Sequence, residues 1–486
     1  MSVKVISPPA TWYPVFTLNA RIYKYIIIWF FLLNCVSIFE KVVCYFGSWS
    51  IYRQGNGKFD ISNINPNLCT HIIYTFIGLS SDGSVQVLDS WADLPSGLNG
   101  FGKTTALRQK SSGTKVMIAI GGWNQGSTVY SQVFGNPSTR SRFVQSVVSF
   151  LKQYKFDGID VDWEYPNQRG GQPADKQNFV DTLRQLKQEL SKSGLLLSVA
   201  VAAAESSASQ SYIINQVAQN VDFINLMAYD FNGAWNKFAG QNAPLYSASR
   251  ESGNQAKLNV VRAPASKLVL GIPLYGRSYT FQNSGNNKPG APVSGAGTAG
   301  PYTQEAGMLA YNEICESIEK GGWTVARDNE QRVPYAFKGN QWVSYDDVQS
   351  VKDKTGLVNS LGLGGAMVWS VDTDDFRGSC GQKYPLLSTV YSTVRNGAPV
   401  PNPPPPTTVP PTRPTVTPPP PPPPSGVCSH EGYVRDPHDC NIFYYCQKSN
   451  GKWTTFTYHC PTGLAFDPSI NGCNYRRAMK KCDNVY

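Results

Sequence analysis

The sequence predicts an α/β protein: a (β/α)8 barrel with an inserted α+β subdomain, followed by a small disulfide-rich β module at its C-terminal end. Three observations predict this architecture. Eight short apolar runs alternate with helix-like stretches over residues 40–395, a proline-rich segment follows them, and six cysteines are concentrated after residue 426. A chain of 486 residues is long enough for one large barrel and a small appended module.

The barrel prediction depends on the character of the apolar runs. Each run is apolar at nearly consecutive positions, as in strands that are buried on both faces of a parallel sheet. The runs are 42–45, 72–76, 116–120, 158–162, 195–200, 223–227, 268–272 and 366–369. Between them lie helix-like stretches such as 176–192, which places Phe179, Val180, Leu183, Leu186 and Leu190 on one face. Strands and helices that alternate eight times predict a barrel over 40–395.

The seventh and eighth runs are separated by a segment that is too long for a simple helical connection. From Tyr275 to Tyr345 it is rich in Tyr, Gly and Trp, which predicts an inserted α+β subdomain at about 275–345.

An apolar segment near the N-terminal end predicts a leader over residues 1–39. Arg21 and Lys24 precede about 15 apolar residues from Tyr25 onward, which is typical of a secretory signal and short for a membrane span of about 20. An unremoved signal anchor and a buried core helix are the alternatives. Removing Cys35 with the leader leaves ten of the 11 cysteines, an even number that fits disulfides in a secreted, extracellular protein.

A proline-rich linker over 396–425 divides the chain. Sixteen of the 27 residues from Pro399 to Ser425 are proline, so this segment favours extended polyproline II. The module at 426–486 is too small for a large core, and its six cysteines favour stabilisation by three disulfides. A zinc site is the alternative, since His430, His438 and His459 lie nearby, but a C-x2-C pair is missing.

Composition narrows the class of partner. Charged residues make up 16% of the chain and aromatic residues 12%, which suits a neutral polymer such as a polysaccharide better than nucleic acid. The net charge of +10 is spread along the chain, as on a solvated surface, although it would also attract an acidic matrix. In 40–395 His71 is the only histidine, and Gly121-Gly122 lacks a downstream Lys-Ser/Thr, so neither a metal nor a cofactor is predicted.

The strongest chemical signal is the acidic run at 158–164. Asp160, Asp162 and Glu164 alternate along a predicted strand, so all three point into the barrel at its C-terminal end. Repulsion and desolvation keep such a row from ionising fully, so at least one pKa must rise. Glu164 lies nearest the mouth, and its acidic neighbours would keep it protonated as a general acid.

These residues match the D-G-x-D-x-D-x-E signature of glycoside hydrolase family 18, and residues 40–395 resemble an animal-type chitinase. The resemblance also includes 41–46 with Trp49, Gly121-Gly122-Trp123-Asn124, 227–231 and 365–369. It implies a secreted, monomeric endo-chitinase that cleaves β-1,4 bonds between N-acetylglucosamine units, without a stable membrane association once the leader is removed. It implies a retaining mechanism in which the substrate's own acetamido oxygen attacks and forms an oxazolinium ion.

The resemblance also implies roles for individual residues. Glu164 would protonate the leaving oxygen and then activate water, Asp162 would orient the acetamido N–H, Asp160 would share a proton with Asp162, and Tyr229 would bind the acetamido carbonyl. Trp369 would form the floor beneath the sugar at the cleaved bond. The remaining substrate-binding candidates are Tyr45, Trp49, Phe76, Trp123, Asn124, Met227, Asp230, Trp235, Tyr275 and Arg277.

The last 61 residues resemble the peritrophin-A chitin-binding domain, carbohydrate-binding module family 14. Candidate sugar contacts there are Tyr444, Tyr445, Trp453 and Phe466. The two resemblances imply the disulfides Cys44–Cys69, Cys315–Cys380, Cys428–Cys446, Cys440–Cys482 and Cys460–Cys473. Two other functions stay open on the sequence: a chitin-binding lectin or matrix protein that does not hydrolyse, and a hydrolase of N-glycans or bacterial wall sugars.

Overall fold

The structure, a computed structural model, describes residues 40–395 apart from 112, 254–256 and 258–265. In the tail it describes 428, 432–437, 439–440, 442–449, 452–460, 464–468 and 472–475. The chain divides into two compact units, one up to Pro404 and one from Pro405, and each is described by itself. The predicted leader and linker lie outside the described residues.

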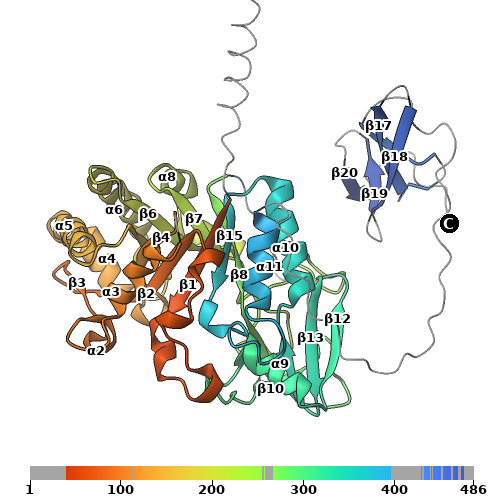
Figure 1. Ribbon diagram of the computed structural model, residues 1–486, viewed down its shortest axis with the longest axis horizontal. Coiled ribbons are helices and arrows are strands. Elements are labelled where there is room, and N and C mark those ends of the chain that lie inside the picture. Colours follow the sequence, from red (N-terminus) through yellow and green to blue (C-terminus); the bar gives the residue numbers. More distant parts are fainter. Residues whose placement is uncertain are drawn as a thin grey trace, which may run out of the picture. The chain divides into compact units, whose positions relative to one another are not determined.

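Eight parallel strands close into a barrel, as predicted (Figure 1). They are β1 (Lys41–Gly47), β2 (His71–Leu79), β4 (Lys115–Gly121), β5 (Gly158–Asp162), β6 (Leu196–Ala202), β7 (Phe223–Met227), β8 (Leu268–Pro273) and β15 (Gly365–Trp369). Each pairs with the next, and β1 closes the barrel by pairing with both β2 and β15. A short strand, β3 (Val85–Gln86), adds to β2 in the antiparallel sense.

Side chains alternate between two cores along each strand. On β1, Val43 and Tyr45 point into a small core inside the barrel, together with Met117 of β4 and Met367 of β15. The intervening residues, such as Val42, belong to the larger core between strands and helices. Burial on both faces explains why the strands are apolar at consecutive positions.

Helices surround the barrel. The larger ones are α4 (Thr128–Gly135), α5 (Pro137–Tyr154), α6 (Asp175–Ser191), α10 (Val348–Leu361) and α11 (Pro385–Val394); α2 (Ser90–Asp93), α3 (Gly100–Thr105), α7 (Glu205–Ser211) and α8 (Ile214–Gln219) are short. Helix α6 buries Phe179, Val180, Leu183, Leu186 and Leu190, so the predicted apolar face is confirmed. No helix among the described residues combines the length and apolar character needed to cross a membrane.

The predicted α+β subdomain is inserted between β8 and β15. Its antiparallel sheet has the order β10-β9-β14-β13-β12, with β11 also paired to β9. The strands are β9 (Tyr275–Phe281), β10 (Val293–Ala296), β11 (Met308–Ala310), β12 (Thr324–Asp328), β13 (Val333–Lys338) and β14 (Gln341–Ser344), and α9 (Tyr311–Glu319) accompanies them. Because β9 follows β8 directly, the insertion begins at the C-terminal end of a barrel strand, where barrel active sites are built.

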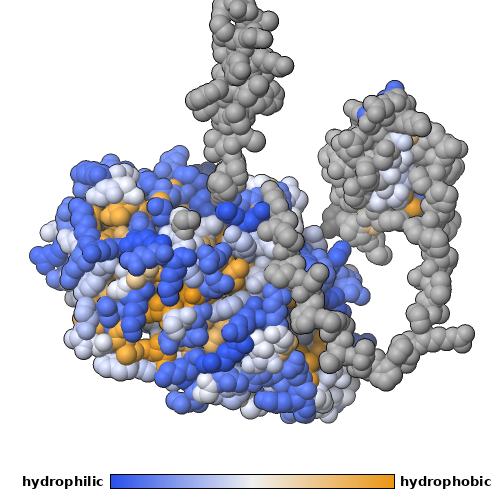
Figure 2. Space-filling model, viewed as in Figure 1, coloured by the Kyte–Doolittle hydropathy of each residue, from blue (hydrophilic) through white to orange (hydrophobic). Residues whose placement is uncertain are grey.

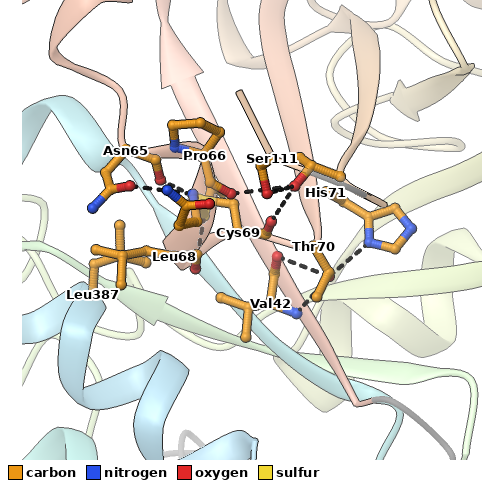
Figure 3. Close-up of a disulfide and its surroundings, with 12 residues drawn as sticks. Val42, Asn65, Pro66, Leu68, Cys69, Thr70, His71, Ser111 and Leu387 are labelled. Atoms are coloured by element: carbon orange, nitrogen blue, oxygen red, sulfur yellow. Dashed lines mark hydrogen bonds between the residues drawn. A yellow bond between two sulfur atoms is a disulfide. The ribbon is translucent and has the colours of Figure 1, made fainter. Parts of the chain in front are cut away.

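Three of the five expected disulfides are confirmed: Cys44–Cys69, Cys315–Cys380 and Cys428–Cys446. Cys440 and Cys460 are also disulfide-bonded, while the side chains of their expected partners lie outside the described residues. Figure 3 shows the surroundings of Cys69, where Thr70 bonds the backbone of Val42 and the ring of His71. Burial lowers the pKa of His71 to about 4, so this imidazole is a neutral packing group at the start of β2.

The tail consists of antiparallel strands held by the Cys428–Cys446 bridge. A three-stranded sheet contains β16 (Gly432–Arg435), β17 (Ile442–Ser449) and β18 (Lys452–His459), and a second pair contains β19 (Leu464–Asp467) and β20 (Gly472–Tyr475). The predicted small β module is therefore confirmed.

Candidate active site

The predicted carboxylate row lies at the C-terminal end of β5. Asp160 and Asp162 are buried inside the barrel, and Glu164, two residues further on, is half-buried. Their neighbours Ile159 and Val161 belong to the outer core, which confirms the predicted alternation. Asp160 and Asp162 share one inner face because strand residues two apart point the same way, and Glu164 follows just beyond the end of the strand.

Asp160 is the most completely hydrogen-bonded member of the row. It accepts hydrogen bonds from Tyr45 Oη at 2.7 Å, Ser198 Oγ at 2.6 Å and Asn225 Nδ2 at 3.2 Å. Burial raises the pKa of Asp160, and these three donors oppose the rise by stabilising the carboxylate. These three hydrogen bonds fix the position of Asp160, the first of the three carboxyl groups.

Asp162 has a different environment. Its Oδ1 atom is buried and receives no hydrogen bond from any residue that the structure describes. Burial, followed by the charges of Glu164 and Asp160, raises the pKa of Asp162 well above its usual range. An unpaired oxygen at this depth is suited to a polar group of a bound ligand, because burying it without a partner is costly.

The pKa of Glu164 is raised chiefly by burial. Burial raises the pKa of Glu164 to about 7, and the charge of Asp230 adds to the rise, while Tyr165 and Arg169 oppose it. The sequence predicts that acidic neighbours keep Glu164 protonated, whereas in the structure burial is the larger cause. A carboxyl group with a pKa near 7 can both donate and accept a proton at neutral pH.

A second wall of the site follows β7 and includes the first strand of the insertion. Asp230 accepts hydrogen bonds from Tyr275 Oη at 2.7 Å and from Arg277 Nε and Nη2 at 2.7 and 2.8 Å. Asp230 has a left-handed φ of 56°, and its N–H donates to Asn242 Oδ1 at 3.0 Å. The inserted subdomain thus fixes the carboxylate of Asp230, which raises the pKa of Glu164.

Tyr229, next to Asp230 in the sequence, is 9% exposed, and its hydroxyl lies 3.8 Å from Met367 Sδ.

Aromatic side chains from three strand ends gather around Trp369. Ring centroids lie 5.4 Å from Trp369 for Tyr45, 5.9 Å for Phe76 and 6.2 Å for Trp49, and Trp49 stacks on Phe76 at 6.1 Å. Rings at this spacing stabilise one another. The faces of Trp49, Phe76 and Trp369 that are not fully buried suit the C–H groups of a pyranose.

Two further predicted platforms are exposed and paired with cations. Trp123 is 58% exposed with the Arg169 guanidinium 3.6 Å from its ring centroid, and Trp235 is 61% exposed with Arg277 at 5.2 Å. Figure 2 shows apolar patches on a largely hydrophilic face of this unit. Independently of that view, the large exposed apolar side chains among the described residues include Trp49, Trp91, Trp123 and Trp235. Asn124 is exposed next to Trp123.

Several predicted sugar contacts have other positions. Tyr45 and Tyr275 are buried, and their hydroxyls hold Asp160 and Asp230, so the structure makes them supports of carboxylates and not stacking platforms. Met227 is half-buried and packs against the inner core.

Two candidates in the tail also need correction. Tyr444 is buried and bonds Asp436, and Phe466 is fully buried and stacks on Phe443 at 4.4 Å, so these rings form the module's core and offer no face to a sugar. Trp453 is 37% exposed with Lys448 Nζ 5.3 Å from its ring centroid. The side chain of Tyr445 lies outside the described residues.

Three residues of the site are absent from the sequence prediction: Ser198, Asn225 and Arg169. Ser198 and Asn225 interrupt the apolar runs of β6 and β7, and a polar residue inside a buried strand is a signal that could have identified both. Arg169 lies in a loop and has no comparable signal. In the part of the chain that the structure describes, the one group with metal-like spacing is Cys315, Asp375 and Cys380, whose sulfurs are joined in a disulfide.

Comparison with known proteins gives two family matches. Residues 41–374 match the glycosyl hydrolases family 18, and residues 428–482 match the chitin binding Peritrophin-A domain. Chitotriosidase-1 of Mus musculus is 39% identical over 456 residues, which cover 90% of this chain and 95% of that protein.

Solved structures agree with these matches. The Ostrinia furnacalis Group IV chitinase in complex with allosamidin superposes with a TM-score of 0.71 at 43% identity, covering 73% of this chain and 98% of that one. Human YKL-39, described as a pseudo-chitinase with retained chitooligosaccharide binding, superposes with a TM-score of 0.68 at 37% identity, covering 74% and 100%.

Proposed function

The chain belongs to family 18 of the glycosyl hydrolases and is a glycoside hydrolase of the chitinase type, and within that class we propose a more specific function. It acts as a secreted, monomeric endo-chitinase that hydrolyses β-1,4 bonds between N-acetylglucosamine units with retention of configuration. The observation that carries the proposal is Glu164, a half-buried acid with a pKa of about 7. It lies two residues from Asp162, whose buried Oδ1 has no hydrogen-bond partner among the described residues.

The proposed reaction begins with proton transfer from Glu164 to the glycosidic oxygen. As that C–O bond breaks, the acetamido oxygen of the same sugar attacks the anomeric carbon and forms an oxazolinium ion. Asp162 accepts the acetamido N–H through its unpaired oxygen and stabilises the positive ring, and Tyr229 donates to the acetamido oxygen. Glu164 then removes a proton from water, which opens the ring and restores the acid.

The remaining residues bind the polymer. Trp369 is the floor at the cleaved bond, and Trp49, Trp123 and Trp235 extend the apolar surface along the chain of sugars. In the tail, Trp453 is an exposed aromatic contact for chitin, and tethering to the polymer raises the local concentration of bonds around the barrel. The disulfides of both units support secretion, because such bonds persist in oxidising compartments.

Hydrolysis of N-acetylglucosamine oligomers, with retention on chitin beads in parallel, tests the proposal. We expect the wild-type chain to cut a hexamer to dimers and trimers and to be retained on the beads. Retention without cleavage would instead indicate a non-hydrolytic binding protein, and cleavage of N-glycans or bacterial wall sugars in preference to chitin would indicate the third candidate function.

The pH profile tests the origin of the acid's pKa. The protonated form of Glu164 is lost as pH rises through about 7, so the basic limb of kcat/KM should lie near there. Asp230→Asn removes a negative charge that raises this pKa, and it frees the positive charge of Arg277. Both effects favour the ionised acid, so the limb should move to lower pH; an unmoved limb would contradict the electrostatic link.

A further inference from the structure

Arg169 lies outside the carboxylate row but contacts two parts of the site at once. Its Nη1 donates to the backbone oxygen of Trp123 at 2.8 Å and to the backbone oxygen of Glu164 at 2.9 Å. The guanidinium carbon lies 3.6 Å from the centroid of the Trp123 ring. One side chain therefore joins the loop after β4 to the loop after β5.

The stacking leaves Trp123 with one free face. The indole is 58% exposed even though the guanidinium covers one of its faces, so the exposed area belongs mainly to the opposite face. A Trp side chain on a short loop loses conformational entropy when a ligand orders it. Because Arg169 stacks on one face of Trp123, the indole is already restricted before a ligand binds, so less entropy is lost on binding.

The backbone conformation of the loop after β5 places the Arg169 guanidinium against Trp123. Asn167, Arg169 and Gly170 have positive φ values of 61°, 51° and 92°. Left-handed backbone is uncommon for residues other than glycine, and it persists where surrounding contacts hold it. Here the buried carboxylate of Asp175 accepts the N–H groups of Asn167 and Gln172 at 3.3 and 2.7 Å.

Arg169 is also close enough to influence the acid. Its positive charge opposes the rise in the pKa of Glu164 that burial causes. It is exposed, so replacing it removes no part of the core.

We propose that Arg169 is a positioning residue that fixes Trp123 as a one-faced platform for an N-acetylglucosamine unit and links this platform to the backbone of Glu164. This inference rests on the proposed function, since it assumes that the sugar polymer passes over Trp123. The required chemistry is a planar cation that donates to two carbonyls and stacks on a ring, which arginine supplies and lysine does not.

Binding and kinetics separate the possible outcomes. In a Glu164→Gln background, calorimetry with the N-acetylglucosamine hexamer should show about fivefold weaker binding for Arg169→Gln, and a similar loss for Arg169→Lys. In the presence of Trp123→Ala, Arg169→Gln should cause no further loss. Equal losses with and without Trp123, or no loss at all, would overturn the proposal.

A second readout distinguishes positioning from a general effect on the loop. With Glu164 intact, Arg169→Gln should move the basic limb of kcat/KM to higher pH, because a charge that favours the ionised acid is removed, while Arg169→Lys should leave it in place. A lower Tm with an unmoved limb would indicate loop stability alone. Arg184→Gln, an exposed arginine on α6, is the matched control. If the wild type neither binds nor cleaves the hexamer, the proposed function fails; if it cleaves and Arg169→Gln matches it, only this inference fails.

Discussion

Replacing Glu164 with Gln is expected to lower kcat on N-acetylglucosamine oligomers by about a thousandfold or more while binding is retained. The amide has nearly the same shape but cannot protonate the leaving oxygen or remove a proton from water. Both proposed chemical steps depend on this one group, whose burial raises its pKa to about 7. The measurement is steady-state hydrolysis of the hexamer, with affinity from calorimetry.

Glu319→Gln is the control for this substitution, because Glu319 is exposed on α9 and lies outside the site. It should leave kcat, KM and Tm unchanged. A Glu164→Gln variant that keeps more than about a tenth of wild-type kcat would exclude Glu164 as the acid, because a general acid contributes about a hundredfold or more.

Asp162→Asn is expected to lower kcat by about a hundredfold to a thousandfold, with a smaller change in KM. The carboxylate faces the positive charge that develops on the oxazolinium, and a neutral amide cannot stabilise it in a buried site. Burial and the charge of Glu164 raise the pKa of Asp162, so the substitution also removes a titrating group next to the acid.

The interpretation of Asp162→Asn depends on the variant being folded. Its Tm should be equal to or above that of the wild type, because the substitution removes a buried carboxylate whose ionisation burial disfavours. Asp82→Asn, at an exposed ion pair with Arg142, is the matched control and should have wild-type kinetics. If Asp162→Asn kept wild-type kcat and raised only KM, Asp162 would bind substrate without acting in the reaction.

The barrel could be predicted from the sequence because its signal is local. Each of the eight strands is buried on both faces, so each appears as a largely apolar run that can be recognised without knowledge of its neighbours. Asp160, Asp162 and Glu164 stand out for the same reason: they are acids in a run where apolar residues belong. Length and composition predict the insertion but not its strand order, because strand pairing depends on segments that are distant in the sequence.

Roles that depend on non-local contacts could not be predicted in this way. Tyr45 and Tyr275 are aromatic residues of the type that stacks on sugars. Only the fold shows that their hydroxyls donate hydrogen bonds to Asp160 and Asp230. Phe466 and Trp453 are both aromatic residues in the tail, yet one is core and one is exposed. Arg169 donates to backbone oxygens of two loops, and a sequence does not indicate which backbone oxygens a side chain will contact.

The central claim is that Glu164 is the acid and that the substrate's acetamido group, with no protein nucleophile, forms the intermediate. The most direct test is the anomeric configuration of the first products from the N-acetylglucosamine hexamer, followed by proton NMR before mutarotation. Two successive displacements at the anomeric carbon predict that the β-anomer appears first. Initial release of the α-anomer would show direct attack by water and would contradict this mechanism.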